Sequence, residues 1–110
     1  KLSLSALAEV PFISYHRDRA LKNLQLEALR QHGIAPNDRF SADSSDTILG
    51  FVAAGLGFSL VPSLSSSGPR VAGVVAQRLE RPVASFPVYA MWRKSNSANP
   101  LIEAALAASE

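Results

Sequence analysis

The amino-acid sequence predicts an α/β fold in which a parallel-rich sheet is flanked by helices. Strand and helix patterns alternate through the first half of the chain, from residue 12 to residue 61. Such an alternation implies βαβ crossovers and therefore parallel strands. Residues 46–62 pass from a helical pattern through a glycine turn into a short apolar strand, which is typical of an αβ junction. The 110 residues are 47% hydrophobic, enough for one domain with a core.

The junction at residues 46–62 is the part around which the remaining elements are organised. Its apolar side chains recur at helical spacing and form one stripe: Ile48, Phe51, Val52 and Leu56. Ser44 or Ser45 can cap the start of this helix, and Asp46 suits the positive end of the helix dipole. Gly55 and Gly57 are predicted to end the helix, because glycine adopts the left-handed conformation of a C-terminal cap.

The other elements are predicted in chain order. Ser3 can cap a helical turn that ends near residue 8. Strands are predicted at 12–15, 40–43 and 58–61, and a helix at 20–32 that Gly33 closes.

The second half of the chain begins with residues 62–73, which are rich in Ser, Gly and Pro and indicate a surface connection. A strand is predicted at 74–79, and another at 87–93 with Val88, Ala90 and Trp92 on one face. A last helix is predicted after the Asn99–Pro100 start signal. Its buried stripe is Leu101, Ile102, Ala105 and Leu106.

Composition excludes several classes. The chain has no cysteine, so disulfides and thiolate chemistry are excluded. A net charge of +2 gives no electrostatic footprint for nucleic acid. The longest apolar run, residues 48–61, is too short and too interrupted to span a bilayer, so no membrane partner is predicted. Because the chain starts at Lys1, we expect its N-terminus to be a cut and the chain to be a fragment.

Four pieces in order resemble a known family: SLSALAEVPFISY, QHGIAP, DTILGFVAAGLGFSLVP and VYAMWRKSNSANPLIEAAL. They are similar to the effector-binding domain of LysR-type transcriptional regulators, and the glycine-rich VAAGLGFSLVP is the most specific of them. The resemblance covers the whole chain but only the later part of the family's domain. It implies a fold like that of type 2 periplasmic binding proteins, with two α/β subdomains and an effector in the cleft between them.

The same resemblance implies a division of the chain. Residues 1–80 would form most of the second subdomain, and residues 81–110 would be a strand and helix that return to the first. It also implies a cytoplasmic homo-oligomer that senses a small, anionic metabolite without a cofactor. Contact with DNA would belong to a winged helix-turn-helix outside this chain. With most of the first subdomain absent, cover from another chain or from a rearranged packing should be needed by Val88, Trp92, Ile102 and Leu106.

Candidate effector contacts follow the carboxyl ends of the predicted parallel strands, where ligands bind in open sheets. They are Tyr15, His16, Arg17, Asp18, Ser44, Ser45 and Pro62. Arginine can bind a carboxylate or phosphate through two hydrogen bonds, and serines at a helix start can donate to an anion. The alternatives are an exposed loop with internally paired charges, a tyrosine that only packs, and serines that only cap the helix.

The helix at 20–32 has apolar residues spread too widely for packing on one sheet alone. Leu26 and Leu29, with the Lys22 stem, are therefore candidates for a second surface. In the LysR family this helix packs against the first subdomain of a partner subunit. The alternative is that Leu26 is an ordinary exposed leucine.

Catalysis and metal binding find little support. The chain has no Gly-x-Ser-x-Gly elbow, and His16 and Asp18 lie too close on one loop to form a relay with a serine. Two histidines without cysteine make no zinc site. The remaining alternatives to a regulator are a fragment of a periplasmic solute-binding protein and, with less support, a small α/β enzyme.

Overall fold

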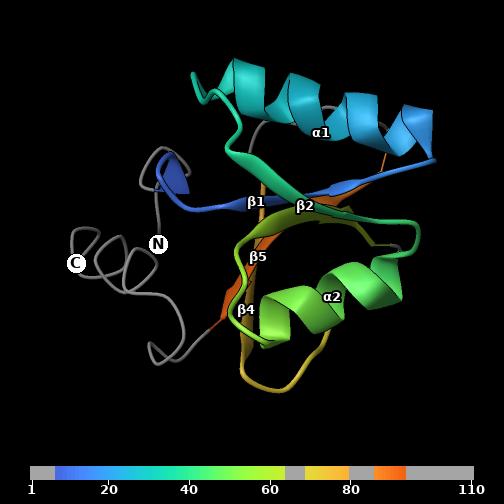
Figure 1. Cartoon of the computed structure of the whole chain (residues 1–110), viewed down its shortest axis with the longest axis vertical. Helices are drawn as coiled ribbons and strands as arrows, with labels where there is room; N and C mark the ends of the chain where they lie inside the picture. Colours follow the sequence, from blue (N-terminus) through green and yellow to red (C-terminus); the bar gives the residue numbers. More distant parts are fainter. Residues whose placement is uncertain (1–6, 64–68, 80–85, 94–110) are drawn as a thin grey trace.

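The computed structural model describes residues 7–63, 69–79 and 86–93 (Figure 1). The elements in these ranges are β1 (Phe12–Tyr15), α1 (Arg19–Gln31), β2 (Asp38–Ala42), α2 (Ser45–Ala53), β3 (Ser59–Pro62), β4 (Val74–Arg78) and β5 (Val88–Arg93). The predicted alternation of strands and helices in the first half of the chain is confirmed. The predicted last helix, with Ile102 and Leu106, lies outside the described residues, as does the start of the helical turn that Ser3 was expected to cap.

The strand pairings confirm a parallel arrangement of the first three strands. β1 and β2 pair in parallel, and an isolated parallel bridge joins Phe12 of β1 to Phe58, the residue before β3. β5 pairs antiparallel with both β3 and β4. The strands thus form a two-stranded sheet, β2-β1, and a three-stranded sheet, β3-β5-β4. The Phe12–Phe58 bridge joins them in the order β2-β1-β3-β5-β4, with β5 running against the other four strands.

Gly57 explains why β1 and the start of β3 lie so close. A Cβ atom at this position would lie 2.3 Å from the carbonyl oxygen of Pro11. Without one, the Phe58 N–H donates to the Pro11 oxygen at 3.0 Å, and the Ile13 N–H donates to the Phe58 oxygen at 2.9 Å. Gly55, with a φ of 82°, is the left-handed glycine after α2. The prediction that Gly57 shares this helix-ending role is therefore wrong: its role is the close approach of two strands.

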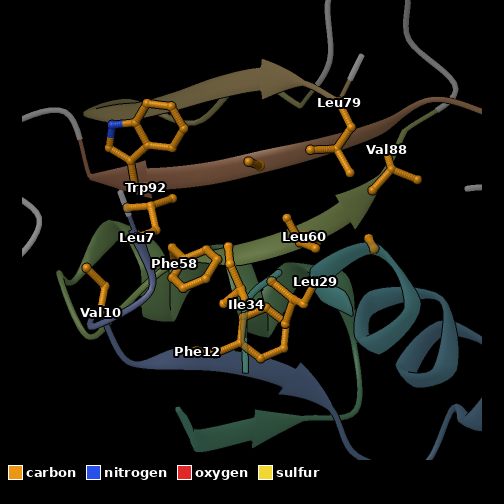
Figure 2. Packing of buried hydrophobic residues seen from close by; sticks show 12 residues of the cluster. Leu7, Val10, Phe12, Leu29, Ile34, Phe58, Leu60, Leu79, Val88 and Trp92 are labelled. Atoms are coloured by element: carbon orange, nitrogen blue, oxygen red, sulfur yellow. The ribbon is translucent and has the colours of Figure 1, made fainter. Parts of the chain in front are cut away.

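The two helices cover opposite sides of the strands (Figure 1). Ala28 and Leu29 of α1 pack into one hydrophobic cluster, and Ile48 and Val52 of α2 pack into the other. Figure 2 shows the first cluster, with Leu29 among the apolar side chains contributed by the strands. Alternate residues of the strands point to alternate clusters, so the core has two layers around one sheet.

β5 illustrates this arrangement and corrects two expectations. Val88, Ala90 and Trp92 belong to the α1-side cluster, while Tyr89 and Met91 belong to the α2-side cluster. The predicted apolar face is thus confirmed, but the opposite face is buried as well because β5 is a central strand. Val88 is 4% exposed and Trp92 is 3% exposed within this chain, so of the two expected sources of cover, another chain is not needed for these two residues.

The helix boundaries follow from their caps. Ser44 caps α2, as predicted for Ser44 or Ser45. Leu56 lies beyond the end of α2 and is 37% exposed, so its predicted place in the buried stripe is wrong. α1 begins at Arg19, one residue before the predicted start, because Asp18 is its N-cap. Ile48 and Val52 are buried as the stripe predicted.

Candidate functional site

The predicted contact residues lie at one edge of the sheet. Because β1, β2 and β3 are parallel, their carboxyl ends meet at the same edge, at Tyr15, Ala42 and Pro62. The His16 N–H donates to the Ala42 carbonyl oxygen at 2.9 Å and extends the β1–β2 pairing past the end of β1. The exposed His16 side chain stands at the start of the loop toward α1. This edge is where an open parallel sheet places a ligand.

Tyr15 and Ser45 are brought together across this edge. Tyr15 ends β1, Ser45 opens α2, and their hydroxyl oxygens are 2.6 Å apart. Burial raises the pKa of Tyr15 above its ordinary value despite the opposing hydrogen bond with Ser45, and the charge of Asp18 raises it further. The hydroxyl therefore keeps its proton at neutral pH. The residue is 1% exposed, so its ring packs in the core, as the alternative interpretation of this tyrosine has it.

Arg17 is an exposed cation at this edge. Its side chain is 83% exposed, and its Nε lies 3.7 Å from Oδ2 of Asp43, a residue that is itself 55% exposed. An exposed ion pair of this length contributes about 0–1 kcal/mol, so its partner can be exchanged at little cost. Asp43 follows β2 directly and was not among the predicted contacts.

Asp18 and Ser44 are occupied as helix caps. The Asp18 carboxylate accepts the Leu21 N–H at 3.0 Å at the start of α1. The Ser44 hydroxyl accepts the Thr47 N–H at 3.2 Å and donates to the Thr47 hydroxyl at 3.0 Å. Each cap satisfies a helix amide that would otherwise lack a partner. The alternative interpretation of Ser44 as a plain cap is thus the one its contacts support.

Pro62 stands farther along the same edge. It ends β3, is half-buried, and pairs in register with Val88 of β5. The Ser63 N–H then donates to the Pro87 carbonyl oxygen at 3.1 Å. Proline offers no backbone donor, so this part of the edge contributes shape and apolar surface.

Gln25 is a polar residue of the fold that the sequence analysis missed. Its side chain is fully buried; Oε1 accepts the Tyr15 N–H at 3.1 Å, and Nε2 donates to the Leu60 oxygen at 2.9 Å and to Ser59 Oγ at 3.3 Å. The Ser59 hydroxyl in turn donates to the Ile13 oxygen at 2.6 Å. These contacts link α1 to the seam between β1 and β3. The sequence did contain a signal of this burial: Gln25 lies one turn from Leu21 and one turn from Leu29, inside the apolar stripe of the helix.

The candidate dimer residues divide into two groups. Leu29 is 0% exposed and lies in the α1-side cluster, so its prediction as part of a second surface is wrong. Leu26 is half-buried. The Lys22 ammonium lies 3.6 Å from Oδ2 of Asp38, at the start of β2, and its side chain is 29% exposed. Lys22 and Leu26, both half-buried, thus remain candidates on the side of α1 from which Lys22 reaches β2.

No group of three or more His, Asp or Glu side chains in residues 7–63, 69–79 and 86–93 could hold a metal ion. No helix in those ranges is long and apolar enough to cross a bilayer.

Comparison with known proteins gives the family. The model of the LysR substrate binding domain matches residues 1–109. A curated relative, the uncharacterized HTH-type transcriptional regulator YybE of Bacillus subtilis strain 168, is 29% identical over 102 residues. That match covers 93% of this chain and 34% of the relative, so the chain spans about a third of the relative's length. No solved structure matches. Since the family model matches almost the whole chain, the chain belongs to the LysR substrate-binding domain family, as its resemblance predicted.

Proposed function

We propose that this chain is the effector-sensing part of a LysR-type regulator and binds a small anionic metabolite at the edge formed by the ends of β1, β2 and β3. Binding would control DNA contact by a winged helix-turn-helix domain elsewhere in a longer, cytoplasmic protein. Support comes from the family match and from a relative named as an HTH-type regulator, of which the chain spans about a third. No catalytic step is part of the proposal.

The exposure of Arg17 is the observation that supports an anionic ligand. Its guanidinium is largely exposed, and its ion-pair partner among the described residues is Asp43, at 3.7 Å and itself exposed. A ligand carboxylate can replace Asp43 and form a bidentate pair, which is shorter and stronger. Asp18 does not compete for Arg17 through its capping oxygen, because that oxygen accepts a helix amide. Exposed Asp46 would repel an anion, so the ligand should approach from the Arg17 side.

The predicted boundary between the two subdomains, at residue 80, does not fit the strand pairing. Residues 1–80 were assigned to the second subdomain and residues 81–110 to the return into the first, but β5 lies between β3 and β4 in one sheet. A boundary at residue 80 would separate strands that pair with each other. We therefore propose that the return to the first subdomain follows Arg93.

The test is calorimetric titration of the intact regulator with acetate, succinate, benzoate and inorganic phosphate. We expect Arg17→Ala to weaken binding of the responsive anion about tenfold to hundredfold, because a charge-assisted hydrogen bond contributes about 1.5–3 kcal/mol. DNA binding without the anion should change little. Arg39→Ala is the matched control, since Arg39 is an exposed arginine near the opposite end of β2. Equal affinities for wild type and Arg17→Ala would remove Arg17 from the site.

A further inference from the structure

The backbone pairing of β1 with β3 stops after a single bridge. The Ile13 N–H donates to the Phe58 oxygen at 2.9 Å, as in a regular parallel ladder. Because the bonds of a parallel ladder are evenly spaced, the next one would join the Tyr15 N–H to the Leu60 oxygen. Both groups bond to the side chain of Gln25 instead: the Tyr15 N–H donates to Oε1 at 3.1 Å, and Nε2 donates to the Leu60 oxygen at 2.9 Å. An amide side chain thus occupies the next position of the ladder.

A serine extends this interruption of the sheet. The Ser59 hydroxyl donates to the Ile13 oxygen at 2.6 Å and accepts from Gln25 Nε2 at 3.3 Å. Gln25 is 0% exposed, and its amide both donates and accepts within the core. Side chains therefore join the carboxyl halves of β1 and β3, which belong to two separate sheets. The amide of Gln25 sets the distance between these two strand ends.

The same contact fixes the loop that carries Arg17. This loop, residues 16–18, runs from Tyr15 at the end of β1 to Arg19 at the start of α1. Gln25 belongs to α1 and accepts the Tyr15 N–H, so one hydrogen bond ties the two ends of the loop together. A short loop with fixed ends samples fewer conformations than one with a free end. The hydrogen bond therefore restricts where the Arg17 guanidinium can lie.

We propose that Gln25 is a positioning residue of the anion site: its amide holds the end of β1 at a set distance from β3 and so presents Arg17 to the ligand. This role rests on the proposed function, since Arg17 belongs to that site. Gln25 is fully buried, so it acts through the loop and not by contact with the ligand. A loop that is ordered beforehand lowers the entropy cost of binding.

The chemistry of an amide suits this position. One strand offers the Tyr15 N–H and the other offers the Leu60 oxygen, so the inserted group must accept and donate at once. A neutral amide does both, whereas a carboxylate only accepts and a hydrocarbon side chain does neither. A leucine of similar volume would therefore fill the space without holding either strand.

The experiment is calorimetric titration of the intact regulator with whichever of acetate, succinate, benzoate and inorganic phosphate binds the wild type. Gln25→Leu should weaken binding of that anion about three- to tenfold, because the ligand must then order the loop at 16–18 itself. In an Arg17→Ala background the same substitution should cause no further loss, because Gln25 acts through Arg17. Where Gln25→Leu does not fold, Gln25→Met, which is unbranched and adapts to the space, takes its place.

Amide hydrogen exchange of the regulator without ligand, resolved to single residues, is the second measurement. In Gln25→Leu the Tyr15 N–H should lose about fivefold or more of its protection relative to the Ile13 N–H, which bonds to the backbone of Phe58. Equal losses at the two amides would mean that the substitution destabilises the whole fold, and would overturn the proposal.

Ser14→Ala is the matched control, because it removes a buried β1 hydroxyl whose partner, Asp38 at 2.9 Å, lies in β2. It should lower stability without changing affinity. Full affinity in Gln25→Leu, or an equal loss of affinity in Ser14→Ala, would overturn the role of Gln25 and leave the site standing. A wild type that binds none of the four probes would overturn the anion site and this role with it.

Discussion

At the scale of single residues, Gln25 should contribute most to stability, although it is not among the proposed ligand contacts. Gln25 satisfies the Tyr15 N–H and the Leu60 carbonyl, two groups that face each other across the seam between β1 and β3. Gln25→Leu keeps the volume but leaves both groups unpaired. We expect it to reduce the free energy of unfolding by about 1–3 kcal/mol. Urea unfolding measures this.

Asn23→Leu is the control for Gln25→Leu, because Asn23 is exposed on the same helix and should change stability by less than about 0.5 kcal/mol. An unchanged stability in Gln25→Leu would mean that the polar contacts give no net stabilisation. Helical spacing puts Gln25 one turn from Leu21 and one turn from Leu29, but it cannot identify the partners of the glutamine. Those partners come from strands distant in sequence, and spacing along one helix does not reveal them.

At the scale of elements, the close approach of β1 and β3 depends on Gly57. An alanine Cβ would lie 2.3 Å from the Pro11 oxygen, so the backbone must shift. We expect Gly57→Ala to destabilise the protein by about 1–3 kcal/mol, as overpacking usually does. Gly50→Ala is the matched control: its Cβ would meet nothing within 4 Å, and Gly50 lies inside α2. That change should stabilise by about 0.5–1 kcal/mol. Thermal unfolding of both variants checks the opposite signs, and equal melting temperatures would contradict the argument.

The same elements show what local sequence could predict. The helix that became α2, the strand that became β3 and the Ser44 cap follow from patterns within a few residues, and all were predicted. The two roles of Gly55 and Gly57 could not be separated, because both glycines follow one helix and only one has a positive φ. The second is required by Pro11, which lies far away in the sequence.

At the scale of the whole molecule, the alternation of strands and helices along the chain predicted parallel strands, but it did not predict the position of β5 between β3 and β4. Its apolar residues occupy consecutive positions from Val88 to Trp92, a pattern typical of a strand buried on both faces. The sequence prediction considered only the face of β5 that carries Val88, Ala90 and Trp92. Because the chain was expected to be a fragment, that face was expected to lack cover within the chain. Pairing with both β3 and β4 instead makes β5 a central strand, and the two hydrophobic clusters cover its two faces. The candidate site was located by topology, whereas the roles of Tyr15 and Ser44 required side-chain contacts.

The last prediction concerns assembly through the side of α1 that carries Lys22 and Leu26. Leu26 is half-buried and lies one turn after Lys22, which reaches Asp38 at the start of β2. If this side contacts a second subunit, an arginine in place of Leu26 would bury an unpaired charge in the interface, while the core contact of Leu29 would remain. We expect Leu26→Arg to weaken dimerisation of the intact regulator about tenfold or more. Light scattering at several concentrations measures this, with Asn23→Arg as the exposed control on the same helix. A dimer that dissociates at the same concentration in wild type and Leu26→Arg would exclude this side of α1 from the interface.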